Sequence, residues 1–132
     1  MTLELVPLCT ATVELAEAIS VSSTLIIGEV TGVRVEGERI NAAMKGRAAA
    51  DWLRVSPDGY GTIDVRMTLE TDDGAAVFVS YSGRLDFTTM TAYATPQFDT
   101  GDERYAWLTR IQAVAKGVFG GAGLVYEMYE LR

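Results

Sequence analysis

Asp51 and Trp52 are adjacent in the sequence, and this pair is the first candidate for chemistry. An indole ring beside a carboxyl group can shield it from water, which raises the carboxyl pKa and makes the group a usable general acid or base near neutral pH. The alternative is structural: Asp51 caps backbone N–H groups in a turn, and Trp52 packs in the core.

Asp64 and Arg66 are two residues apart, so in a strand they share one face. If that face lines a cavity, Arg66 can bind a carboxylate or enolate oxygen, with Asp64 as its anchor or as a base. If the face meets solvent, the two belong to cross-strand ion pairs of little energetic value. Alternation of side chains does not decide between the two.

Tyr81, Tyr93, Tyr126 and Tyr129 form a loose set of phenols. A phenol can donate to an oxyanion or contact a flat ligand, and it can equally fill the core. We expect Tyr81 to be the oxyanion donor and Tyr93 to contact the ligand. Trp107 is either a packing anchor or a further ligand contact.

The sequence has no histidine and one cysteine, Cys9. The lack of histidine excludes Ser-His-Asp and Cys-His catalysis and the usual histidine metal sites. The glycine-rich residues 117–123 fit neither Walker nor Rossmann spacing and are interpreted as a flexible hairpin loop. We therefore expect no metal and no cofactor, with Asp51, Arg66 and Tyr81 as catalytic groups, and Cys9 as a buried structural thiol.

The composition indicates one globular domain over residues 1–132, with 48% apolar residues. The formal net charge of −7 repels phosphate backbones and anionic lipid, so we expect neither a nucleic-acid nor a membrane partner. The N-terminus does not resemble a signal peptide, and no apolar run is long enough to span a membrane as a helix. These features predict a cytoplasmic protein.

The elements that must position these residues are strands. Residues 63–70 alternate between apolar and polar side chains, and Asp73-Gly74 then gives a strong hairpin signal before a second strand at residues 75–81. Residues 52–55 and the turn at 57–59 lead into this hairpin, so we expect a meander over residues 52–81. Further strands are expected at residues 3–15, 24–30, 34–43, 87–94, 111–118 and 124–131.

Turn residues recur about every ten positions, which is typical of an all-β sandwich or barrel. Asp102 can cap a short helical turn within residues 101–110. We predict a predominantly antiparallel, small closed or nearly closed β-barrel of about eight or more strands, with at most a short helix.

An ordered series of motifs resembles domain of unknown function 3237, also called uncharacterised protein family 0311. The resemblance implies a small antiparallel β-barrel and, because the general function of the family is unassigned, no specific activity. The residues that carry it are Glu4 to Leu8, Asp51-Trp52, Pro57-Asp58-Gly59, Thr71-Asp72-Asp73-Gly74, Pro96 to Asp102, Arg104 to Leu108 and Val125 to Glu130.

Together, the candidate residues Asp51, Arg66 and Tyr81 predict an acid–base enzyme of isomerase, cyclase or lyase type that holds a small, partly apolar carbonyl compound inside the barrel. Trp52, Asp64, Tyr93 and Trp107 are the expected ligand contacts. Two alternatives are a barrel that binds a small molecule without catalysis and a homo-oligomeric interaction module. Under all three functions we expect a homo-oligomer, with a dimer as the first expectation.

Overall fold

The computed structural model describes residues 1–121 and 123–132. Nearly the whole chain is extended, as the recurring turn residues predict. The elements are β1 (Leu5–Leu15), β2 (Ile19–Ser22), β3 (Leu25–Glu36), β4 (Ala42–Met44), β5 (Ala50–Val55), β6 (Tyr60–Thr71), β7 (Ala76–Asp86), β8 (Thr91–Ala94), β9 (Gln97–Asp99), the 3₁₀ helix η1 (Glu103–Arg110), β10 (Ala113–Gly120) and β11 (Gly123–Leu131).

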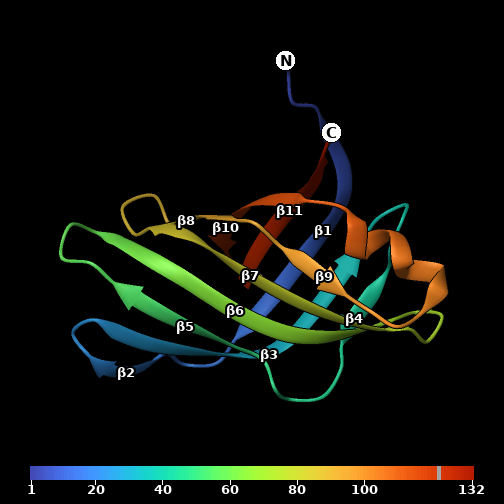
Figure 1. Cartoon of the computed structure of the whole chain (residues 1–132). Coiled ribbons are helices and arrows are strands. Elements are labelled where there is room, and N and C mark those ends of the chain that lie inside the picture. Colours follow the sequence, from blue (N-terminus) through green and yellow to red (C-terminus); the bar gives the residue numbers. More distant parts are fainter. Residues whose placement is uncertain (122) are drawn as a thin grey trace.

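Eight of the strands close into an antiparallel barrel in the order β1-β3-β5-β6-β7-β8-β10-β11 (Figure 1). The ring closes because β1 pairs with β11, the first strand of the chain with the last. Three short strands add to its margins: β2 pairs with β3, β4 pairs with both β3 and β6, and β9 pairs with β7. The predicted fold class is confirmed.

Strand β6 shows why these residues form a barrel wall. Its side chains alternate between exposed and buried, with Ile63, Val65 and Met67 in the interior. A turn with Gly74 at φ 95° joins β6 to β7, and this is the left-handed region that glycine tolerates best. The predicted meander over residues 52–81 is therefore present as β5, β6 and the first part of β7.

Two glycine-based expectations are wrong in detail. Residues 24–30 and 34–43 were expected as separate strands, whereas Leu25–Glu36 is one strand that passes through Gly28 and Gly32. A glycine in a strand interior weakens the strand but does not end it where both neighbours supply ladder partners. Likewise, residues 117–120 belong to β10 rather than to a loop; residue 122 lies outside the described residues.

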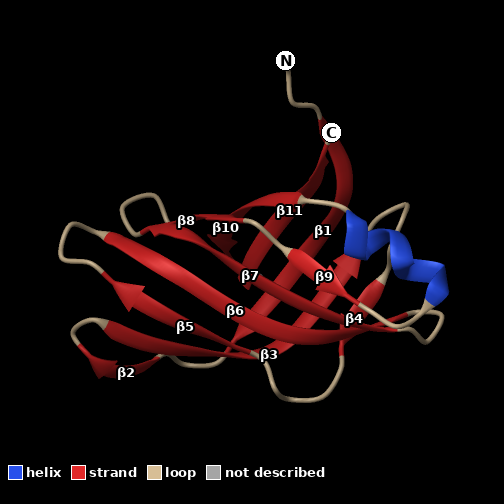
Figure 2. Cartoon of the chain, viewed as in Figure 1, coloured by secondary structure: helices blue, strands red, loops and turns tan. Residues whose placement is uncertain are grey.

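The helix η1 covers one end of the barrel (Figure 2). It begins where expected, because the Asp102 carboxylate accepts the backbone N–H of Arg104 at 2.9 Å. Leu108 is the buried residue of this helix and is fully enclosed in the core. Tyr105 donates to Asp73 Oδ1 at 2.9 Å, which ties the helix to the turn between β6 and β7.

The core is one continuous cluster inside the ring, built mainly of Val, Leu, Ile, Ala and Met side chains. Cys9 is buried within it, as expected, and burial raises the pKa of its thiol to about 12. Among the described residues, no helix has the length and apolarity to cross a membrane.

Candidate functional site

The barrel interior contains an apolar cavity of about 200 Å³. Side chains from all eight barrel strands line it, and nearly all of them are hydrocarbon or aromatic. Leu15 and Met90 also line it while each remains 39% exposed, so the cavity opens to solvent near them. This mouth lies at the end of the barrel away from η1, by the connections β1–β2 and β7–β8 (Figure 1).

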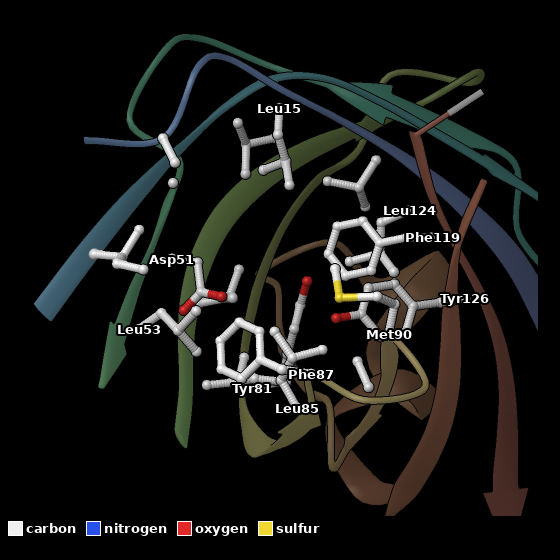
Figure 3. Close-up of a pocket in the computed structure, with 18 residues that line it drawn as sticks. Leu15, Asp51, Leu53, Tyr81, Leu85, Phe87, Met90, Phe119, Leu124 and Tyr126 are labelled. Carbon is white, nitrogen blue, oxygen red and sulfur yellow. The ribbon is translucent and has the colours of Figure 1, made fainter. Parts of the chain in front are cut away.

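Three polar side chains interrupt the apolar wall: Asp51, Tyr81 and Tyr126. Figure 3 shows their oxygen-bearing ends on the cavity side, among Leu53, Leu85, Phe87, Phe119 and Leu124. Asp51 is the one charged residue among the described residues that line this cavity. The cavity therefore combines a carboxyl and two phenols with a surface that is otherwise apolar.

Strand register brings Asp51 and Tyr81 into the same part of the wall. Asp51 of β5 pairs with Val65 of β6, and Val65 pairs with Tyr81 of β7. Residues opposite one another in neighbouring strands point to the same face, so all three side chains face inward. The two functional groups are thus separated by one strand.

Asp51 is partly buried, and burial raises the pKa of its carboxyl to about 6. A hydrogen bond of 3.1 Å from the backbone N–H of Asp64 to Asp51 Oδ1 opposes this shift, and the nearby Asp64 carboxylate adds to it. At pH 7 most Asp51 side chains are ionised, yet they hold a proton much more readily than an ordinary aspartate. Asp51 can consequently serve as a general base.

Tyr81 and Tyr126 meet across the barrel interior, with ring centroids 5.5 Å apart and planes at 72°. Both are buried, and burial raises the pKa of Tyr126 to about 12 and the pKa of Tyr81 well above its usual value. Both phenols therefore keep their protons near neutrality and can donate hydrogen bonds. Tyr81 also borders a much smaller cavity of about 20 Å³ on the η1 side, so the ring pair forms the floor of the larger one.

Gly117 of β10 makes room for the ring of Tyr126. It is the direct partner of Tyr126 in the β10–β11 ladder. A Cβ atom at position 117 would lie 2.6 Å from Tyr126 Cε1, closer than real contacts allow. The glycine at this position is therefore part of the cavity floor, although the sequence shows it only as one of several glycines.

The remaining predicted site residues lie outside the cavity. Arg66 and Asp64 are on the outer face of β6, where their side chains form a 3.7 Å ion pair that is more than half exposed. The Arg66 guanidinium lies 5.3 Å from the ring centroid of Trp52, which is itself 41% exposed. The interior already holds Ile63, Val65 and Met67, so the intervening polar residues of the strand must point outward.

Tyr93 and Trp107 also lie away from the three cavity groups. Tyr93 is 52% exposed on the outside of β8, with Lys116 Nζ 6.0 Å from its ring centroid. Trp107 belongs to η1 and packs against the core at the closed end, beneath the guanidinium of Arg39 at 4.4 Å. Of the seven predicted site residues, the structure brings Asp51 and Tyr81 together in the cavity.

The sequence indicates Tyr126 as one of four phenols without a role in the site, and it indicates no role for Met90 and Phe119, which also line the cavity. A signal for Tyr126 was present, because it lies two residues from each of the apolar Leu124 and Met128 and so shares their inward face. No comparable pattern marks Met90, which lies in a turn at a φ of 52°.

No group of three or more Cys, Asp or Glu side chains suited to a metal ion occurs over residues 1–121 and 123–132.

Solved structures resemble this barrel over almost its full length. A β-barrel-like protein from Acinetobacter baumannii AYE is 27% identical, with a TM-score of 0.90 over 100% of this chain and 98% of the other. A conserved protein of unknown function from Rhodopseudomonas palustris is 23% identical, with a TM-score of 0.90 over 100% and 99% of the two chains. A protein from Penicillium herquei described as an enzyme is 22% identical, with a TM-score of 0.74 over 99% and 94%. At these last two identities the likeness shows the fold alone.

No curated protein matches the sequence. The family model described as "Protein of unknown function (DUF3237)" matches residues 3–94 and 84–131.

Proposed function

Since this chain belongs to the DUF3237 family of proteins of unknown function, we propose a function from its cavity: acid–base catalysis, without a cofactor, on a small and mostly apolar carbonyl compound held inside the barrel. The observation that carries the proposal is the Asp51 carboxyl, which has a pKa raised to about 6 and lines an apolar cavity together with two buried phenols. A perturbed carboxyl in a concave, apolar site is a physical indicator of function.

Asp51 acts as the base in this proposal. Its carboxylate takes a proton from a carbon next to the substrate carbonyl, so that a C–H bond breaks and an O–H bond forms on Asp51. The electron pair left behind moves onto the carbonyl oxygen as an enolate. Return of the proton by Asp51 to the same or to a conjugated carbon gives an isomerase. A cyclase results if the enolate carbon instead attacks an electrophilic carbon of the same molecule and Asp51 gives its proton to the oxygen that becomes negative. A lyase results if the enolate expels a hydroxyl group at the next carbon, which leaves as water with that proton.

Tyr81 and Tyr126 stabilise the enolate oxygen by donating a hydrogen bond to it. Both phenols keep their protons near neutral pH because burial raises their pKa values. A donor already in place in an apolar site is worth much more than one in water, and loss of such a donor typically costs about 10²–10³-fold in rate. Arg66 has no role in this scheme, since its guanidinium lies over Trp52 on the outer face.

The experiment is proton exchange at carbon. 1-Phenylpropan-2-one, a neutral ketone with activated C–H bonds next to its carbonyl, is incubated with the protein in D₂O, and deuterium incorporation is followed by NMR. We expect catalysis by the unaltered protein and a loss of about 10²-fold or more in Asp51→Asn. Asp64→Asn is the matched control, because it removes the same charge from the outer face of the neighbouring strand. Equal exchange rates in Asp51→Asn and the unaltered protein would exclude Asp51 as the base.

A second candidate function is ligand binding without chemistry. It is favoured by the wall of the cavity, because Asp51 is the one charged side chain among the described lining residues. No second charged group of that wall is therefore available for proton transfer. This candidate predicts saturable binding of the same ketone with no deuterium incorporation above the background rate.

The interaction module, which was the other alternative, required a filled interior, and the cavity of about 200 Å³ gives it no support. Homodimer formation and a cytoplasmic location stay predictions.

A further inference from the structure

The charge distribution around the cavity indicates what kind of ligand it can hold. No Lys or Arg is among the described residues that line it. Two nearby cations of the barrel wall point outward, where Arg66 lies over Trp52 and Lys116 over Tyr93. An anionic ligand would therefore lose its hydration, gain no counterion and lie next to the Asp51 carboxylate, and each of these costs free energy in an apolar environment.

A cationic ligand is disfavoured for a different reason. An ammonium group bound at Asp51 would pair with the carboxylate and lower its pKa. Taking both charges out of water can cost more free energy than their attraction returns, because the rest of the wall is almost entirely apolar, and a bound ammonium group would also occupy the base. The remaining polar atoms of the wall are the phenols of Tyr81 and Tyr126, which suit a neutral oxygen.

The cavity volume sets the size of the ligand. An apolar cavity of about 150 Å³ in another protein binds benzene, and the volume here is about 200 Å³. The space accommodates one ring and a short substituent. The two ends of the cavity differ, because Tyr81 and Tyr126 are buried at its floor while Leu15 and Met90 are partly exposed at its mouth.

We infer that the substrate is electrically neutral and about the size of one substituted ring, with its carbonyl group at the floor near Asp51, Tyr81 and Tyr126 and its apolar end against Met90 at the mouth. This inference rests on the proposed function and narrows it. Carboxylates, phosphate esters and ammonium compounds of the same shape are rejected by charge, and two-ring compounds are rejected by size.

The test uses a matched set of ligands and a reporter at the mouth. The methionine methyl groups are labelled with ¹³C, and the protein is titrated at pH 7.5 with 1-phenylpropan-2-one, phenylacetate, 2-phenylethylammonium and 1-(biphenyl-4-yl)propan-2-one. The first two have nearly the same shape and differ in charge. Met90 reports on the cavity, while the buried Met67 and Met128, which lie outside its wall, are internal controls for folding.

We expect 1-phenylpropan-2-one to shift the Met90 methyl signal, and each of the other three ligands to bind at least tenfold more weakly. Ala92→Val, which adds two methyl groups to the wall, is expected to weaken binding of the ketone at least tenfold. Should Met67 and Met128 show that this variant is misfolded, Gly28→Ala replaces it, since its new Cβ would meet its nearest neighbours at 3.9 Å.

Equal or tighter binding of phenylacetate or 2-phenylethylammonium with the same Met90 shift would overturn the inference about charge and leave the proposed function standing. Equal binding of the biphenyl ketone would overturn the inference about size. Absence of any Met90 shift with 1-phenylpropan-2-one, up to its solubility limit, would overturn the ligand class as a whole. Binding without deuterium exchange would instead contradict the proposed catalysis and leave standing the charge and size inferred for the ligand.

Discussion

The carboxyl of Asp51 extends from β5 into a wall of apolar side chains, and this position links its proton equilibrium to folding. Burial raises its pKa from an ordinary value of 3.8 to about 6, so the folded protein binds a proton more tightly there than the unfolded chain does. The stability that Asp51 contributes is therefore full below pH 3.8 and is lost as the pH rises through about 6.

Asp51→Asn is expected to remove this pH dependence. The amide oxygen can still accept the backbone N–H of Asp64, while the cost of a buried charge at high pH disappears. Relative to the unaltered protein, the variant should gain roughly 1–3 kcal/mol between pH 4 and pH 8. Urea unfolding at both pH values measures the gain. A similar gain in Asp64→Asn, the outer-face control, would contradict burial as its cause.

Gly117 is a second residue whose effect is local and predictable. In Gly117→Ala the new Cβ would overlap the ring of Tyr126, which must then move out of its position on the cavity floor. We expect a loss of about 1–3 kcal/mol in the free energy of unfolding and weaker binding of 1-phenylpropan-2-one. Gly120→Ala is the control in the same strand, because its Cβ would have no neighbour within 4 Å. Equal effects of the two substitutions on binding would show that the Tyr126 ring is not fixed by Gly117.

The strands show which parts of the site the sequence could predict. Alternation in β6 indicated one apolar and one polar face but not which of them points inward, and the structure places Asp64 and Arg66 on the outer face. Asp51 lies inside with Leu53, two residues further along β5, whereas the sequence alone left a capping position in a turn open for it. The convergence of Asp51 with Tyr126 depends on ring closure between β1 and β11, a contact between the ends of the chain that no local pattern encodes.

The helix η1 was predictable from its cap, yet its role is set by a tertiary contact. Leu108 is fully buried, so Leu108→Ala leaves a cavity at the closed end of the barrel. We expect a loss of about 2–5 kcal/mol in the free energy of unfolding, with the affinity for 1-phenylpropan-2-one unchanged in the folded protein. Leu5→Ala, at a position that is 56% exposed, is the control and should have little effect. A loss of affinity in Leu108→Ala would show that the two ends of the barrel are coupled.

At the scale of the whole molecule, the motifs that carry the family resemblance divide between the two ends of the barrel. Thr71 to Gly74 and Arg104 to Leu108 meet at the closed end, where Asp73 accepts from both Thr71 Oγ1 at 2.6 Å and the Tyr105 hydroxyl. Asp51 of the Asp51-Trp52 pair instead lines the cavity. One end thus holds the fold together through polar contacts, while the other presents the chemical groups.

Closure of the ring predicts that both ends unfold together. Every barrel strand is paired on both sides, so no strand can leave without breaking two ladders. The two tryptophans report on different parts of this ring, Trp52 on the outer face of β5 and Trp107 in η1. The variants Trp107→Phe and Trp52→Phe each keep a single tryptophan. In each variant we expect one cooperative urea-unfolding transition. The transition followed by tryptophan fluorescence should coincide with the transition followed by far-UV circular dichroism. A transition of Trp107 fluorescence at a lower urea concentration than the circular dichroism transition would mean that η1 detaches first and that the closed end is a separate unit. Ligand binding at the cavity would then raise the urea midpoint reported by Trp52 and leave the midpoint reported by Trp107 unchanged.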